Sequence, residues 1–82
     1  MNEFEINDYL DLLPKLSRRE IQVLAMTCLG FNRSEVAIKL NISVRTVDNH
    51  LNHAMQKYEL NSYSQLKAQF FFNFLRNLKK SH

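Results

Sequence analysis

The sequence is poor in residues that break helices and in residues that cross-link chains. Its 82 residues include one glycine, one proline, one cysteine and no tryptophan. So few turn formers argue against an all-β fold, because every hairpin needs its own turn. A single cysteine excludes an intramolecular disulfide and suits a reducing compartment. These absences favour helices joined by short turns, and we expect a cytoplasmic protein.

Long apolar runs are also missing. No stretch approaches the roughly 20 apolar residues that span a bilayer, and the first charged residues are acidic, unlike those of a signal peptide. A chain of this length can bury one small core but not a deep substrate cleft. We therefore expect a single soluble domain with no membrane partner.

Basic residues are absent from the first 14 positions, and this divides the chain by charge. Residues 1–14 carry four acids, a net charge of −4, whereas the remaining 68 residues carry all eleven Lys and Arg residues against four acids, a net charge of +7. A stretch so basic is a candidate binder of polyanions. An ordinary solvated basic surface has the same composition, so charge alone leaves both interpretations open.

Capping patterns and apolar spacing predict an all-α fold. An acidic helix is expected within residues 1–14, where Asn2 and Glu5 can form a capping box and Pro14 ends the helix. Residues 15–82 form the main domain, and its final helix covers about 62–80. The four helices of this domain are predicted to follow the N-caps Ser17, Asn32, Ser43 and Ser62.

Two of these helices are joined by a tight turn. Only about three residues around Asn41 separate them, and Asn tolerates the left-handed conformation that such a turn needs. Ala37, a small residue, lies where the two helices would approach closely. This spacing is typical of a helix-turn-helix, in which the second helix enters the DNA major groove. A plain helical hairpin in a small bundle has the same spacing.

The residues around this turn resemble the LuxR/GerE type of DNA-binding domain. The segment LSRREIQVL at positions 16–24 is similar to the opening of that domain, and the similarity extends without a gap over about residues 15–72. The other matching positions are Gly30, Glu35 to Ala37, Leu40 to Ser43, Thr46, Val47, His50, Leu51, Ala54 to Lys57, Ser64 and Gln65. The resemblance implies a bacterial transcription regulator, expected at the nucleoid, and a stand-alone member without a sensor domain.

The resemblance also implies that residues 43–58 form the recognition helix. Inward positions 47, 51, 55 and 58 leave a polar opposite face that includes Gln56, and Asn and Gln can pair with adenine while Asp can accept from cytosine. We expect base contacts from Arg45, Asp48, Asn49 and Asn52. We expect phosphate contacts from Arg18, Arg19, Lys39, Ser43, Thr46, His50 and Lys57. A polar helix face that is merely solvated is the alternative.

The sequence departs from the family pattern in three places. Asp48 stands where a basic residue is common, so it either changes the preferred sequence or weakens DNA binding; Arg45, three residues earlier, is positioned to pair with it. Glu59 replaces the usual glycine in the turn before the last helix. Arg33 and Ser34 replace an Asn-Lys pair.

The last helix carries more apolar residues than one side of a helix can hide. Such a surface usually marks a partner site, and the family often dimerises through this helix. We expect a homodimer interface formed by Phe70, Phe71, Phe74, Leu75 and Leu78. The acidic N-terminal helix is the alternative cover for part of this surface.

The sequence contains no motif typical of an enzyme. Cys28 lies on an apolar helix face, no phosphate-binding loop is present, and His50 with His53 lacks a second pair of metal ligands. We expect no cofactor and no metal. Two hypotheses remain: a sequence-specific transcription regulator that binds double-stranded DNA as a homodimer, and a regulator of the same fold that acts through protein contacts with a related regulator or RNA polymerase.

Overall fold

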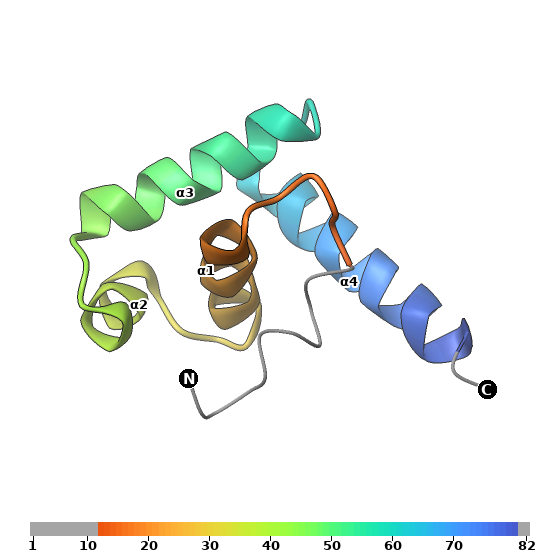
Figure 1. The fold of residues 1–82 in the computed structure, drawn as a ribbon, viewed down its shortest axis with the longest axis horizontal. Helices are drawn as coiled ribbons and strands as arrows, with labels where there is room; N and C mark the ends of the chain where they lie inside the picture. The colour runs from red at the N-terminus through yellow and green to blue at the C-terminus, as the bar shows by residue number, and fades with distance from the viewer. Residues whose placement is uncertain (1–11, 81–82) are drawn as a thin grey trace.

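The computed structural model describes residues 12–80, which form four helices joined by turns (Figure 1). The helices are α1 (Arg18–Cys28), α2 (Arg33–Leu40), α3 (Val44–Lys57) and α4 (Tyr63–Lys80). Residues 12–80 contain no strand, which confirms the predicted all-α class. Most of the predicted acidic helix lies outside the described residues. Its expected last residues, Leu12 and Leu13, lie in a turn and a bend instead of a helix.

The helix boundaries follow from local capping chemistry, as predicted. Ser17 and Glu20 form a reciprocal capping box at the start of α1, and Asn32 and Glu35 form one at the start of α2. The Ser43 hydroxyl accepts a hydrogen bond from the Thr46 backbone N–H at the start of α3. Each cap satisfies backbone donors that a helix leaves unpaired, so these short helices begin at defined residues.

The turn between α2 and α3 confirms the helix-turn-helix geometry. Asn41 ends α2 in the left-handed conformation with φ 57°, and its side chain makes this conformation less costly than it is for most residues. The turn between α3 and α4 uses the same conformation at Glu59, with φ 55°. Glutamate gains no such local compensation, so the backbone at Glu59 is strained. The chain nevertheless reverses its direction there.

The core lies where α3 crosses α1 and α2 (Figure 1). Apolar residues spaced three and four apart on each helix point into it, and side chains at this spacing share one helix face. The buried core consists of Leu12, Leu13, Leu16, Ile21, Val23, Leu24, Ala25, Met26, Val36, Ala37, Val47, Leu51, Ala54, Leu66 and Phe70. Met55 and Tyr58 are partly buried against this core, in agreement with their predicted inward positions, and so is Cys28 on the apolar face of α1. Leu40 is also partly buried against it.

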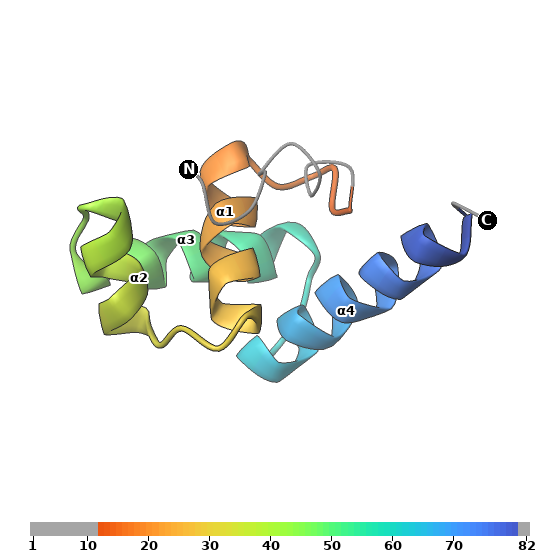
Figure 2. The same ribbon diagram turned by 90° about the horizontal axis from the view of Figure 1, so that it is seen from below.

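The last helix leaves the body of the molecule. The first half of α4 packs beside α1, whereas its second half projects beyond the other three helices (Figures 1 and 2). Phe70 is 4% exposed and belongs to the core, so this part of the predicted dimer interface is wrong: the residue faces α1 inside its own chain. The polar Asn73 donates through Nδ2 to the Leu12 carbonyl oxygen at 2.8 Å, which holds the start of the described chain against α4.

Candidate nucleic-acid interface

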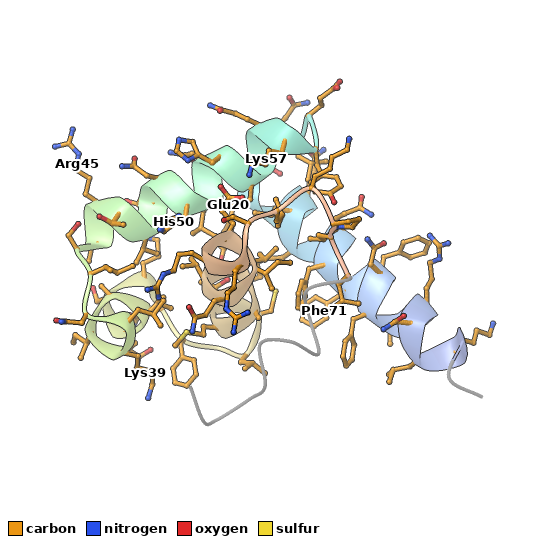
Figure 3. All side chains as sticks on the ribbon, viewed as in Figure 1. Glu20, Lys39, Arg45, His50, Lys57 and Phe71 are labelled. Carbon is orange, nitrogen blue, oxygen red and sulfur yellow. The ribbon has the colours of Figure 1, made fainter. Side chains whose placement is uncertain are left out.

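The outer face of α3 is polar and exposed. Burial of Val47, Leu51 and Ala54 fixes the rotation of the helix, and the opposite side is left to solvent. Arg45 points away from the body of the molecule at one end of α3 (Figure 3). The exposed residues of this outer face are Arg45, Asn49, Asn52, His53 and Gln56.

His53 was missing from the predicted contact set. It is exposed one helical turn after Asn49 and one residue after Asn52, so the same spacing that selects those residues also selects His53. The sequence prediction considered it only as a metal ligand. The described residues contain no group of three or more His, Cys, Asp or Glu side chains that could hold a metal ion.

The N-terminal end of α3 presents two hydroxyl groups. The Ser43 and Thr46 side-chain oxygens lie 2.9 Å apart, and the Ser43 oxygen also accepts from the Thr46 N–H at 3.0 Å. Ser43 is exposed and Thr46 is partly exposed. The partial positive charge of a helix N-terminus favours an anion at this place, and the phosphate role of both residues stays a prediction.

Lys57 is bound to a buried acid, which the sequence prediction missed. Its Nζ lies 2.7 Å from Oε1 of Glu20, and the Glu20 side chain is only 6% exposed. Figure 3 shows the two side chains meeting between α3 and α1. Lys57 therefore neutralises a carboxylate of its own chain, and the structure does not support it as a free phosphate contact.

The environment of Glu20 favours its charged form. Burial alone raises the pKa of the carboxyl, but the hydrogen bond and charge of Lys57, together with the hydrogen bonds from Ser17, outweigh it and leave the pKa below its ordinary value. Glu20 thus closes the α1 capping box and fastens α3 to α1 at the same time.

His50 lies on the edge of α3 that faces α1 (Figure 3). Burial lowers its pKa, and the nearby charges of Arg19 and His53 lower it further against an opposing effect of Glu20, so the pKa lies below its ordinary value. A neutral imidazole at pH 7 can still donate one N–H to a phosphate. Arg18 and Arg19 are exposed on the first turn of α1, and Arg19 donates to Gln22.

Asp48 pairs with a residue of another helix. Its Oδ1 accepts from Nη1 of Arg33, the first residue of α2, at 3.0 Å. The expected pairing with Arg45 is wrong, because Arg45 extends into solvent at the end of α3 (Figure 3). Asp48 and Arg33, two of the three departures from the family pattern, are therefore in contact.

Lys39 lies apart from this surface. Its side chain points away from α3 at the far side of α2 (Figure 3), and its Nζ lies 4.9 Å from the centroid of the Phe31 ring. The structure does not bring Lys39 together with the other predicted phosphate contacts.

A second exposed face, on α4, is apolar. Phe71, Leu75 and Leu78 are spaced as one helical stripe and are 45–61% exposed. Phe72 is exposed on the flank of this stripe, with the Arg76 guanidinium 5.5 Å from its ring centroid. Phe74 is partly buried against the core. We call Phe71, Phe72, Leu75 and Leu78 the α4 patch.

The Cys28 thiol is poorly reactive. Burial raises the pKa of the Cys28 thiol to about 11, so the thiol stays protonated and weakly nucleophilic at neutral pH. Among residues 12–80 no helix is both long enough and apolar enough to cross a membrane.

A helix-turn-helix whose second helix exposes a polar face defines a domain of the nucleic-acid-binding class. Comparison with known families agrees: residues 14–68 match the family of bacterial regulatory proteins described as the luxR family. This match covers more than half of the chain. The chain belongs to the luxR family, a family of DNA-binding transcription regulators and not of enzymes.

Individual proteins similar to this chain support the assignment. The chain is 38% identical over 72 residues to the oxygen regulatory protein NreC of Staphylococcus carnosus (80% of this chain, 33% of the relative). It is 36% identical over 62 residues to NreC of Staphylococcus epidermidis, covering 76% of this chain and 28% of that protein. The chain thus spans about a third or less of the relatives' length. Among solved structures, none matches significantly.

Proposed function

We propose that this protein is a sequence-specific transcription regulator that inserts α3 into the major groove of double-stranded DNA. The observation that carries the proposal is the exposed polar face of α3, placed by the turn at Asn41 as in a helix-turn-helix. Asn49 and Asn52 can form paired hydrogen bonds with adenine, and Arg45 can do so with guanine. The protein would act in the bacterial cytoplasm, at the nucleoid.

Groups around α3 would position it on the DNA backbone. Ser43 and Thr46 lie at the N-terminal end of α3, and His50 and Arg19 lie along its α1 edge. Arg18 is exposed on the same first turn of α1. Hydrogen bonds and charges of this kind bind phosphates without reading sequence, so they would supply the affinity that depends on salt.

The α4 patch would join two copies of the chain. Apolar side chains exposed on a helix that projects from the body are a suitable dimer surface. A two-fold dimer would place two α3 helices on the two halves of a near-palindromic site. Leu75→Asp is then expected to turn dimers into monomers in sedimentation velocity, whereas Asn77→Asp, at an exposed position on the opposite side of the same helix, retains the dimer.

The first experiment is selection of bound duplexes from a random pool, followed by affinity measurements over a range of salt concentrations. We expect a near-palindromic sequence bound with about nanomolar affinity and a steep loss of affinity as salt rises. No enrichment, with only weak binding to all duplexes, would contradict the proposal.

Two variants separate the roles of individual side chains. Asn52→Ala is expected to relax the preference at one base position by about 1–3 kcal/mol. Arg18→Ala is expected to weaken binding to all sequences alike and to reduce the dependence on salt. Small, equal effects of both changes on every sequence would argue against α3 as the reading helix.

The second candidate is a regulator that works by protein contacts, with a related regulator or RNA polymerase as partner. The α4 patch favours it, because an exposed apolar surface can bind another protein whether or not the regulator binds DNA. If selection recovers no sequence, the α4 patch becomes the surface on which to search for that partner.

A further inference from the structure

The ion pair between Arg33 and Asp48 lies at the edge of the reading surface. It joins the first residue of α2 to the second turn of α3 with an Nη1 to Oδ1 distance of 3.0 Å. The Arg33 side chain is 61% exposed and that of Asp48 is 38% exposed. Both residues line a hollow of about 650 Å³ together with Asn52. The exposure of both side chains leaves the pair accessible to a ligand that reaches the α2 edge of α3.

The exposure of this pair makes a purely structural role a poor explanation. Ion pairs between exposed side chains contribute little to stability, because water screens them and both side chains lose rotamer freedom. The fold already has other connections between α2 and α3, namely the turn at Asn41 and the burial of Val36 and Val47. The pair does, however, fix the position of one carboxylate beside Asn49 and Asn52.

A carboxylate at this place needs a partner before DNA can approach. Unpaired, it would repel the phosphates on both sides of the groove. Arg33 cancels that charge and holds Oδ1, and no hydrogen bond to Oδ2 is found among residues 12–80. A carboxylate oxygen in the major groove can accept a hydrogen bond from the N4 amino group of cytosine.

We propose that Arg33 is a positioning residue for base recognition: it holds the Asp48 carboxylate so that the second oxygen reads cytosine. This inference rests on the proposed function, since it requires α3 to lie in the major groove. It assigns to α2 a part in sequence preference, and it makes cytosine the base that faces Asp48.

The test is a double-mutant cycle on the duplex that the selection recovers. Selection with Asp48→Asn first identifies the base pair that faces position 48, because the preferred base there should change from cytosine to adenine. Affinities are then measured for the unmutated protein, Arg33→Gln, Asp48→Asn and the double variant. Four duplexes that differ only at that base pair are used, and circular dichroism confirms that each variant is folded.

We expect the unmutated protein to prefer cytosine by about tenfold at this position. Arg33→Gln should reduce that preference to about twofold or less and weaken binding to the cytosine duplex about tenfold, because it leaves an unpaired carboxylate in the groove. In the Asp48→Asn background the same change should cost less than about threefold, since no carboxylate is left to position. Arg33→Lys should restore part of the affinity.

Arg45→Gln is the matched control. Like Arg33→Gln it removes one positive charge, but from α3 and without touching Asp48. Its loss of affinity should therefore be equal in both backgrounds and leave the cytosine preference unchanged. Equal losses for Arg33→Gln in both backgrounds would overturn the inference and identify Arg33 as a simple phosphate contact. If the unmutated protein prefers no duplex at all, the proposed function fails and the inference fails with it.

Discussion

Within residues 12–80, two ion pairs flank α3, and they differ in burial more than in chemistry. Lys57 meets Glu20 of α1 at 2.7 Å, and Arg33 of α2 meets Asp48 at 3.0 Å. The Glu20 side chain is 6% exposed, whereas that of Asp48 is 38% exposed. A buried carboxylate must keep its partner for the fold to stay stable, whereas an exposed one is free to serve a ligand. The same kind of contact thus fastens one edge of α3 and leaves the other edge available for recognition.

The largest expected effect is the loss of the buried acid. Glu20→Ala removes both the capping box of α1 and the partner of Lys57, so we expect the free energy of unfolding to fall by about 2 kcal/mol. Asp48→Ala should lower it by less than about 0.5 kcal/mol. Urea unfolding followed by circular dichroism measures both.

Glu35→Ala is the matched control for this comparison. Glu35 occupies the same capping-box position in α2 but is exposed. Its loss should cost about 1 kcal/mol or less. Equal losses of unfolding free energy for Glu20→Ala and Asp48→Ala would contradict the claim that only the buried ion pair stabilises the fold.

The buried Glu20 carboxylate should also make the free energy of unfolding depend on pH in the acid range. The pKa of Glu20 is lowered in the folded protein, so folding favours its deprotonated form. Its contribution is complete above the unfolded pKa of about 4.3 and is lost as the pH falls through the lower folded pKa. Urea midpoints between pH 3 and pH 7 should therefore fall less steeply in Glu20→Gln than in the unmutated protein. Parallel curves would contradict the assignment.

Two cations of α3 should separate stability from binding. Lys57→Met leaves Glu20 without its partner, and we expect the free energy of unfolding to fall by about 1 kcal/mol while the DNA affinity changes less than about threefold. Arg45→Met should do the reverse, with unchanged stability and about tenfold weaker binding. Thermal melts and fluorescence anisotropy measure the two effects. A stronger loss of binding for Lys57→Met than for Arg45→Met would show that the pairing with Glu20 yields to DNA.

The smallest expected effect is at Glu59, where the backbone conformation affects stability more than the side chain does. Glu59 is exposed and has φ 55°, a conformation that costs a side chain about 1 kcal/mol. Glu59→Gly should raise the free energy of unfolding by about 0.5 kcal/mol, because glycine relieves this strain but loses more chain entropy on folding. Glu59→Ala keeps the strain, so it should not raise the free energy of unfolding. Thermal melts measure the effects of both changes.

Features that depend on neighbouring residues could be predicted from the sequence. The caps at Ser17, Asn32 and Ser43 and the left-handed turn at Asn41 involve residues at most four positions apart. Their chemistry is therefore readable in the chain itself. The inward face of α3 followed from the same short-range spacing.

Features that depend on packing between helices could not be predicted. Lys57 and Glu20 are 37 positions apart, and Arg33 and Asp48 are 15 apart, so only the crossing of α3 with α1 and α2 brings them together. The burial of Phe70 beside the exposed Phe71 likewise depends on which side of α4 meets α1. Periodicity predicts that a helix has an apolar face but does not identify its partner.

The most direct test of the central claim is a titration of the isotope-labelled protein with the selected duplex, followed through its backbone amide resonances. We predict that the largest shifts fall on α3, from Ser43 to Gln56, and on the first turn of α1, while the α4 patch changes little after the dimer has formed. Large shifts confined to α4, with α3 unchanged, would contradict recognition through α3.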